Sequence, residues 1–341
     1  MTTKDKILEY LKTHGSATGS ELCAHLGVSR QALNKHIKNL IAQSQIIKTG
    51  ATKNASYQYR VGTSRRVASV NSLRKEYRLA DLEEDRVFQE LALSVGLRTK
   101  VTEPTWHIIH YAFSEMLNNA IEHSESQTCT IDLRIDPYDF QFIIRDYGIG
   151  VFYSIFRKFN LPDENAAVGE LIKGKTTTMR ERHSGEGIFF TSKSADIFQL
   201  RSHQICLTFD NKKRDLFLEE RKSIQGTEAR FTISRKSRRK LEAIFAAFAP
   251  EEFDYRFEKT KVFVKLFYDA YISRSEARRL LYGLDKFKVI VLDFKGVKSI
   301  GQGFADEIFR VFKSRHPDIT IEIENLSDTL WPLIRHVTIE K

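Results

Sequence analysis

Three short segments occur in order in the middle of the chain: one pairs carboxylates with amides, and the other two combine glycines with a carboxylate. The first, SEMLNNAIEHS (114–124), belongs to a long helical stretch that begins after Pro104. The second, IIRDYGIGVF (143–152), ends a β-prone run, and the third, HSGEGIFF (183–190), opens an apolar helix. Three such segments in this order, each with its own helix or strand context, predict one composite site.

The first segment carries a carboxylate and a carboxamide on one helix face. Glu115 and Asn119 are four residues apart, so their side chains share a face. An Asn oxygen can ligate Mg²⁺ that bridges phosphates, and a nearby Glu can orient or deprotonate a water molecule. We therefore predict Glu115 as the catalytic residue and Asn119 as the metal ligand and a nucleotide contact.

The second and third segments suit the base and the phosphates of a nucleotide. Asp146 follows a strand, where a buried carboxylate can accept a hydrogen bond from an adenine amino group. The alternate glycines Gly148 and Gly150 would let the backbone approach a flat ligand closely. Gly185 and Gly187 precede a helix whose N-terminal amides can hold phosphate.

A later strand adds Thr227, from GTEARFTI (226–233), as a contact near the adenine. Together these segments resemble the GHKL superfamily (gyrase, Hsp90, histidine kinase and MutL type), and most closely its anti-sigma-factor kinase branch. The resemblance covers residues 101–233. It implies a sandwich of helices on a mixed sheet that binds ATP with Mg²⁺.

The resemblance also implies a mobile lid over residues 160–184. Its expected phosphate contacts are Lys173, Lys175 and Thr176. Residues 169–176 formally match the P-loop pattern GxxxxGK[ST], but a true P-loop follows a buried apolar strand. Here the polar stretch NLPDENAAV precedes the match, so we interpret it as coincidental.

Phosphotransfer to histidine is not expected. The helical stretch 75–96 contains no His, and His107 and His110 lie on the same helix as Glu115. Two enzymatic alternatives stay open: a Ser/Thr protein kinase of the anti-sigma type, and a slow ATPase acting in stress or phage defence.

The N-terminal part of the chain is strongly basic. Residues 1–66 hold eleven Lys and Arg against three Asp and Glu, a net charge of +8. Such a localised charge indicates a polyanionic partner. Gly27 can turn the chain between two short helices, and Ser29 can cap the helix SRQALNKHIKNLIAQ that follows.

This third helix has an apolar face and a polar face. The polar face would contact duplex DNA, because Arg, Gln and Asn read base edges and Lys contacts phosphate. Its DNA-binding residues are predicted as Arg30, Gln31, Asn34, Lys35 and Lys38. Two strands over 46–61 would place Lys48 and Lys53 on a β-wing. The segment resembles the winged helix-turn-helix family of bacterial regulators.

The C-terminal part alternates strands and helices over residues 262–336. Its segment VIVLDFKGVKSIGQGFADEIF (289–309) resembles STAS-like domains, relatives of anti-anti-sigma factors. In that lineage a Ser or Thr before Phe304 can be phosphorylated, whereas this chain has Gly303 there and only Ser299 nearby. We therefore expect a docking domain, with Asp306 and Glu307 solvated on a helix face.

The fold class predicted is multidomain α+β: a winged helix, a GHKL α/β sandwich and a small β/α STAS-like domain. The domain limits expected are a winged helix-turn-helix over 1–63, a helical linker over 64–100, the GHKL domain over 101–234 and the STAS-like domain over 251–341. A basic stretch, SRKSRRK (234–240), is interpreted as a solvated linker.

The function predicted is an ATP-binding transcriptional regulator. Mg-ATP would modulate DNA binding by the winged helix and docking of the STAS-like domain. The partners expected are double-stranded DNA, ATP, a protein partner at the STAS-like domain and a second copy in a homodimer. The start MTTKDKILEY has no apolar signal core, and no run of about 18 apolar residues occurs. We therefore expect a cytoplasmic protein that does not bind a membrane.

Overall fold

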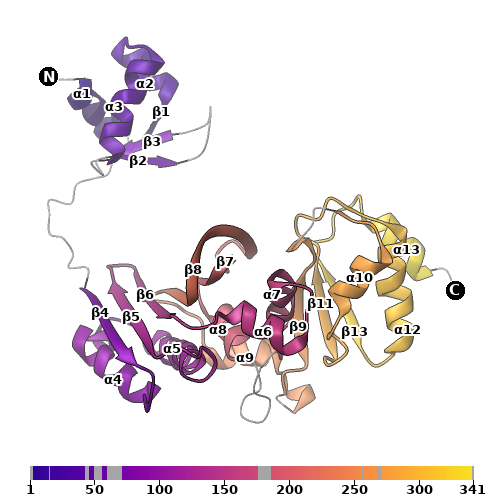
Figure 1. The fold of residues 1–341 in the computed structure, drawn as a ribbon. Helices are drawn as coiled ribbons and strands as arrows, with labels where there is room; N and C mark the ends of the chain where they lie inside the picture. The colour runs from indigo at the N-terminus through magenta and orange to yellow at the C-terminus, as the bar shows by residue number, and fades with distance from the viewer. Residues whose placement is uncertain are drawn as a thin grey trace. The chain divides into compact units, whose positions relative to one another are not determined.

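The computed structural model divides into two compact units, residues 1–69 and 70–341 (Figure 1). The structure describes residues 3–14, 16–42, 46–49, 56–59, 71–175, 186–254, 256–266 and 270–339. No helix among them is long and apolar enough to cross a membrane. Each unit is described by itself.

The first unit is a small helical domain with a three-stranded sheet. Its helices are α1 (Thr3–His14), α2 (Gly19–Leu26) and α3 (Arg30–Ala42), and its strands are β1 (Ser16–Thr18), β2 (Ile46–Thr49) and β3 (Ser56–Tyr59). The strands pair antiparallel in the order β1-β3-β2. Leu33, Ile37 and Leu40 of α3 are buried in its core with Ile7 and Leu11 of α1.

The turn between α2 and α3 has the predicted chemistry. Gly27 ends α2 in the left-handed region at φ 64°, which favours glycine. The Ser29 hydroxyl accepts a hydrogen bond from the Ala32 amide at 3.3 Å, as expected for an N-cap. These two residues fix where the second helix stops and the third begins.

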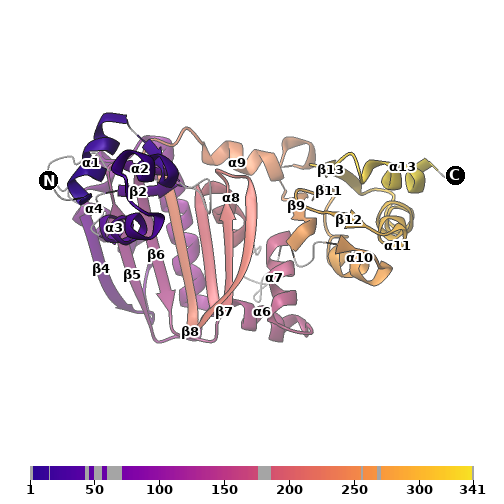
Figure 2. The same ribbon diagram turned by 90° about the horizontal axis from the view of Figure 1, so that it is seen from above.

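The second unit opens with a five-stranded antiparallel sheet. Its strands are β4 (Asn71–Arg78), β5 (Thr128–Ile135), β6 (Asp139–Asp146), β7 (Ile197–Asp210) and β8 (Asp215–Ser234). They lie in the order β4-β5-β6-β8-β7, as Figure 2 shows. All four pairings are antiparallel, so the mixed sheet implied by the resemblance is corrected.

The helices of this part are α4 (Glu84–Val95), α5 (Glu103–His123), α6 (Val151–Phe159), α7 (Glu164–Lys173), α8 (Gly187–Ser194) and α9 (Leu241–Phe248), with short 3₁₀ turns η2 (Leu97–Thr99) and η3 (Glu251–Phe253). Residues 169–173 form the last turns of α7. A P-loop is a loop before a helix, so the rejection of that motif agrees with the structure.

The helical segment predicted over 64–100 includes the helix α4 (Glu84–Val95), but the prediction is wrong for residues 71–78. Residues 71–78 form β4, which pairs with β5 from Asn71–Ile135 to Arg78–Thr128. After it, α4 packs on α5. The strand was missed because NSLRKEYR is a charged edge strand, and edge strands carry charges that make them resemble solvated segments.

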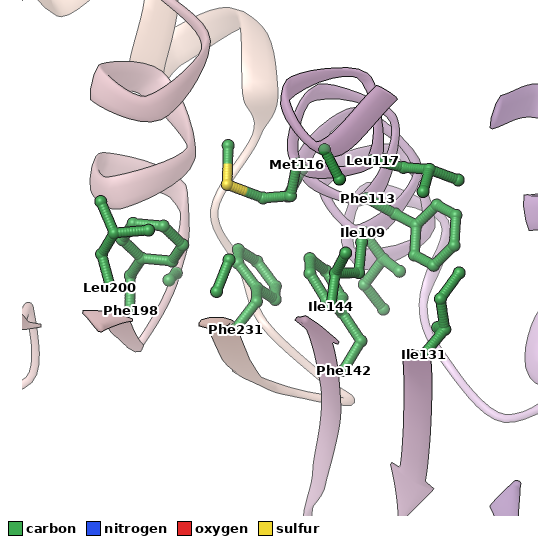
Figure 3. Close-up of a cluster of buried hydrophobic side chains, with 14 of the residues drawn as sticks. Ile109, Phe113, Met116, Leu117, Ile131, Phe142, Ile144, Phe198, Leu200 and Phe231 are labelled. Carbon is green, nitrogen blue, oxygen red and sulfur yellow. The ribbon is translucent and has the colours of Figure 1, made fainter. Parts of the chain in front are cut away.

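The long helix α5 packs one face on the sheet (Figure 3). Its buried residues on that face are Ile109, Phe113, Met116 and Leu117, and they meet Ile131, Phe142, Ile144, Phe198, Leu200 and Phe231 from four strands. Glu115 and Asn119 lie outside this face in the helical repeat, on an adjacent side of the helix. They are therefore directed toward a different neighbour, the helix α8, which contacts α5.

The C-terminal part is a small β/α domain. Its parallel sheet has the order β13-β11-β9, from β9 (Lys259–Phe263), β11 (Val289–Asp293) and β13 (Thr320–Glu324), and β10 (Ala270–Tyr271) pairs with β12 (Ser299–Ile300). Its helical segments are η4 (Val264–Leu266), α10 (Arg274–Leu281), α11 (Gln302–Asp306), η5 (Glu307–Phe312), α12 (Lys313–Arg315) and α13 (Trp331–Ile339). All five residues of β11 are buried, as in other central parallel strands.

Two expectations about charged residues are corrected here. Asp306 and Glu307 are 9% and 3% exposed, not solvated, because Asp306 pairs with Arg274 and Arg310 and Glu307 pairs with Arg278. In the basic stretch 234–240, Arg235 donates to the carbonyl of Lys100 at 2.7 Å, and Arg239 pairs with Asp196 at 3.1 Å. The stretch is therefore partly built into the domain.

Candidate functional site

A cavity of about 430 Å³ opens beside α5. Of the predicted site residues, Glu115, Asn119, Asp146, Gly187 and Thr227 line it together. They come from α5, the end of β6, the start of α8 and β8, so the three sequence segments do converge at one place. Its size falls in the range of small-molecule sites.

Asp146 ends β6 and is 5% exposed. Its Oδ1 accepts hydrogen bonds from the amides of Gly148 at 3.0 Å and Thr227 at 3.1 Å. Burial raises the pKa of this carboxyl, and these hydrogen bonds oppose the rise. A fixed, desolvated acceptor of this kind can receive a hydrogen bond from an exocyclic amino group of a base.

Asn119 carries a buried atom that fits a bound ligand. Its Nδ2 is buried and, among the described residues, has no hydrogen-bond partner. Buried polar atoms are nearly always paired in folded proteins, and Asn119 also lines the cavity, so an acceptor on a ligand, such as a phosphate oxygen, would supply the partner of this donor. The oxygen of the same amide lies on the helix face that carries the Glu115 carboxylate. Oxygen ligands of this kind suit a phosphate-bound Mg²⁺, which keeps few protein ligands.

Gly187 begins α8 directly against α5. A Cβ added there would lie 2.0 Å from Glu115 Oε2, so a larger residue would displace the carboxylate of Glu115 from its present position. The N-terminal amides of α8 are thereby placed at the cavity, next to Glu115. This arrangement is suited to an anionic group, as expected at a helix N-terminus.

Gly148 and Gly150 serve the protein's own packing. A Cβ on Gly148 would lie 1.7 Å from the Ser124 carbonyl oxygen, and a Cβ on Gly150, at φ 84°, would lie 2.4 Å from the Ser202 hydroxyl. Neither residue lines the cavity. The close approach predicted for a flat ligand is therefore corrected: these glycines admit neighbouring protein segments and so place Asp146.

The lysines expected at the phosphates lie elsewhere. Lys173 is 3% exposed, with its Nζ 2.7 Å from Glu170 Oε1, and Lys175 Nζ lies 3.3 Å from Glu258. Neither lines the cavity, because both ammonium groups are engaged by acceptors at the C-terminal domain. This corrects their assignment as phosphate contacts. Thr176 and Gly185 lie outside the described residues.

Several lining residues were not predicted. They include Tyr111 of α5, Leu171 of α7 and Phe245 of α9. Tyr111 lies four residues before Glu115, so the helical spacing could have identified it. Burial, with Glu115 and Glu186 nearby, raises the pKa of Tyr111. Leu171 and Phe245 carry no sequence signal, since they are apolar residues in ordinary helices.

The predicted DNA-binding residues lie in the first unit. Arg30, Asn34 and Lys35 are exposed on α3, while Gln31 and Lys38 belong to the same helix and Lys48 to β2. Lys53 lies outside the described residues. Exposure on the second helix of a helix-turn-helix agrees with a groove-reading role, which stays a prediction.

Comparison with known families gives three matches along the chain. Residues 79–209, from α4 into β7, match a histidine kinase-like ATPase domain. Residues 3–51 match an HTH domain, and residues 276–331 match a STAS-like domain of unknown function. The chain thus joins an N-terminal helix-turn-helix, a histidine kinase-like ATPase domain and a C-terminal STAS-like domain. No curated protein matches it.

Proposed function

We propose that the chain is an ATP-binding regulator whose binding to duplex DNA responds to the nucleotide. The observation that carries this proposal is the cavity in which Glu115, Asn119, Asp146 and Gly187 meet, in a domain of the histidine kinase-like ATPase class. The helix-turn-helix on the same chain supplies the DNA-binding unit. Its basic charge favours a polyanion as partner.

The predicted residues that line the cavity then have distinct roles toward Mg-ATP. Asp146 accepts the hydrogen bond of the adenine amino group, and Thr227 lies beside it. The start of α8 holds phosphate, and the Asn119 amide oxygen contributes to Mg²⁺ binding. Bound Mg²⁺ neutralises phosphate charge. Glu115 orients a water molecule at the phosphate end, which allows slow hydrolysis.

The response to ATP would pass through the second unit. The cavity is lined by Leu171 of α7, Gly187 of α8 and Phe245 of α9, and these three helices also contact the C-terminal domain. A ligand changes an equilibrium only through differential contacts with two states. Nucleotide contacts with these helices can supply that difference, so the STAS-like domain would be the first element to respond.

A titration of duplex DNA with and without Mg-ATP tests the proposal. Fragments selected by the full chain from a random duplex pool would serve as probe, and affinity and stoichiometry would be read by fluorescence anisotropy. We expect Mg-ATP to change at least one of them for the wild-type chain. Identical DNA-binding curves with and without Mg-ATP would contradict the proposed coupling between nucleotide binding and DNA binding.

The variant that tests the base-binding role is Asp146→Asn, and its matched control is Asp132→Asn, a half-exposed Asp on the neighbouring strand β5. We expect Asp146→Asn to bind ATP about 10–100-fold more weakly, because a hydrogen bond to a charged group is worth about 1.5–3 kcal/mol. Asp132→Asn should bind normally. Wild-type ATP affinity in Asp146→Asn would show that the base-binding assignment is wrong.

A further inference from the structure

Helix α7 joins three places in the second unit. At its start, Glu164 lies 3.0 Å from His203 Nδ1 on β7, which fixes this end to the large sheet. In its last turns, Leu171 forms part of the cavity wall. Its C-terminal end contacts β9 of the C-terminal domain, as Figures 1 and 2 show. The position of this wall therefore depends on both domains.

Lys173 makes the most buried of these attachments. Its Nζ contacts Glu170 Oε1 at 2.7 Å and donates to the carbonyl of Tyr282 at 2.7 Å and, more weakly, to that of Arg279 at 3.4 Å. The two carbonyls belong to α10 and its C-terminal cap. Three donors thus meet three acceptors, as a buried ammonium requires.

The backbone around Lys173 is also held by the C-terminal domain. The buried hydroxyl of Thr260 on β9 donates to the Lys173 carbonyl at 2.6 Å. Gly174, at φ 78°, approaches the ring of Phe257 so closely that a Cβ would contact it at 2.7 Å. The end of α7 is therefore fixed through its side chain, its carbonyl and the following residue.

Helix α8 is anchored in the same domain. Phe189 and Phe190 are buried in the C-terminal core, with ring centroids 4.5 Å and 5.2 Å from that of Phe257. The first residue of this helix, Gly187, lies at the cavity against Glu115. Two of the helices that line the cavity, α7 and α8, are thus packed against the C-terminal domain.

We propose that Lys173 is a positioning residue, through which the C-terminal STAS-like domain holds α7 against the nucleotide cavity. This inference rests on the proposed nucleotide site and deepens it: ATP affinity depends on a domain that contributes no residue predicted to contact ATP. Linkage is reciprocal, so bound nucleotide must in turn strengthen the attachment of α7 to that domain.

A purely stabilising role explains the Lys173–Glu170 pair less well. Buried ion pairs lose most of their Coulomb gain to desolvation, and apolar replacements are often as stable. Directed hydrogen bonds to two backbone carbonyls, by contrast, fix an orientation. The pair is therefore suited to setting where α7 lies.

The test compares full-length variants by calorimetric titration with a non-hydrolysable ATP analogue and Mg²⁺. The double variant Glu170→Met with Lys173→Met removes both charges of this buried pair together with the hydrogen bonds to α10 and its C-terminal cap. We expect its cooperative unfolding to be retained and its affinity to fall about tenfold. The control Lys259→Met with Glu322→Met removes an ion pair between β9 and β13 and should bind as wild type.

Amide hydrogen exchange on the wild-type chain gives a second measurement that needs no variant. The analogue should slow exchange in α5 and also over residues 274–284, the segment whose carbonyls accept the hydrogen bonds of Lys173. Wild-type affinity in the double variant, or protection of α5 without protection of 274–284, would overturn the positioning role alone. Absence of analogue binding by the wild-type chain would overturn the nucleotide site and this inference together.

Discussion

At the scale of single residues, the lysine Lys193 shows how an apolar environment acts on a charge. Lys193 on α8 lies among four phenylalanine rings, the nearest being Phe189 with its centroid 4.9 Å from Nζ. Burial, and then repulsion from Lys261, lowers the pKa of Lys193 to about 8 from 10.5, while Asp293 opposes the shift. Its ammonium therefore costs folding free energy at neutral pH.

A pH series with Lys193→Met measures that cost. The folded pKa lies below the unfolded one, so the unfolded chain binds more protons between pH 8 and 10.5, and wild-type stability rises across this window. We expect the Met variant to be more stable at pH 7 by up to about 3 kcal/mol, less the lost cation–π attraction. The difference should shrink from pH 8 upward in urea unfolding. A gap independent of pH would contradict the lowered pKa.

At the scale of elements, the turn after β6 depends on a glycine that admits the end of α5. The Ile149 amide donates to the Ser124 carbonyl at 2.8 Å, and the Gly148 Cα lies against the same carbonyl. The contact is between two backbones, which cannot move aside as a flexible side chain can. It fixes α5 relative to the strand that carries Asp146.

Gly148→Ala should therefore destabilise the fold strongly. We expect a loss of more than about 2 kcal/mol in urea unfolding, since overpacking a rigid site forces the backbone to shift. Gly303→Ala is the matched control, because its Cβ would meet the Arg274 side chain at an ordinary 3.4 Å. Similar midpoints for the two variants would contradict the account of this turn.

The sequence predicted most elements and the five residues that meet at the cavity. Periodicity and glycine spacing identify helices and strand ends, so Glu115, Asn119 and Asp146 could be placed. The charged strand β4 and the two lysines were misread for a common reason. Arg and Lys are usually exposed, and nothing local shows that Lys173 is buried against a segment more than a hundred residues away.

At the scale of the whole molecule, charge is concentrated in the unit expected to bind DNA. If Lys35 on α3 contacts phosphate, Lys35→Ala should weaken binding to all duplex sequences alike. The slope of log affinity against log salt should become shallower by about 0.9, the value for one phosphate contact. Anisotropy titrations at several salt concentrations measure it. Lys286→Ala, in the other unit, should leave the slope unchanged.

The phenylalanines of α8 have a consequence for how such domains can be recombined. Phe189 and Phe190 are 3% and 1% exposed because the C-terminal core covers them. An ATPase domain cut from this chain near residue 250 would lose the Phe257 ring that packs on both, and only Phe245 and Phe248 of α9 would still cover them. Such a fragment would be prone to self-association. We therefore expect a gene fusion or a truncation that separates the two domains to need compensating polar substitutions on α8.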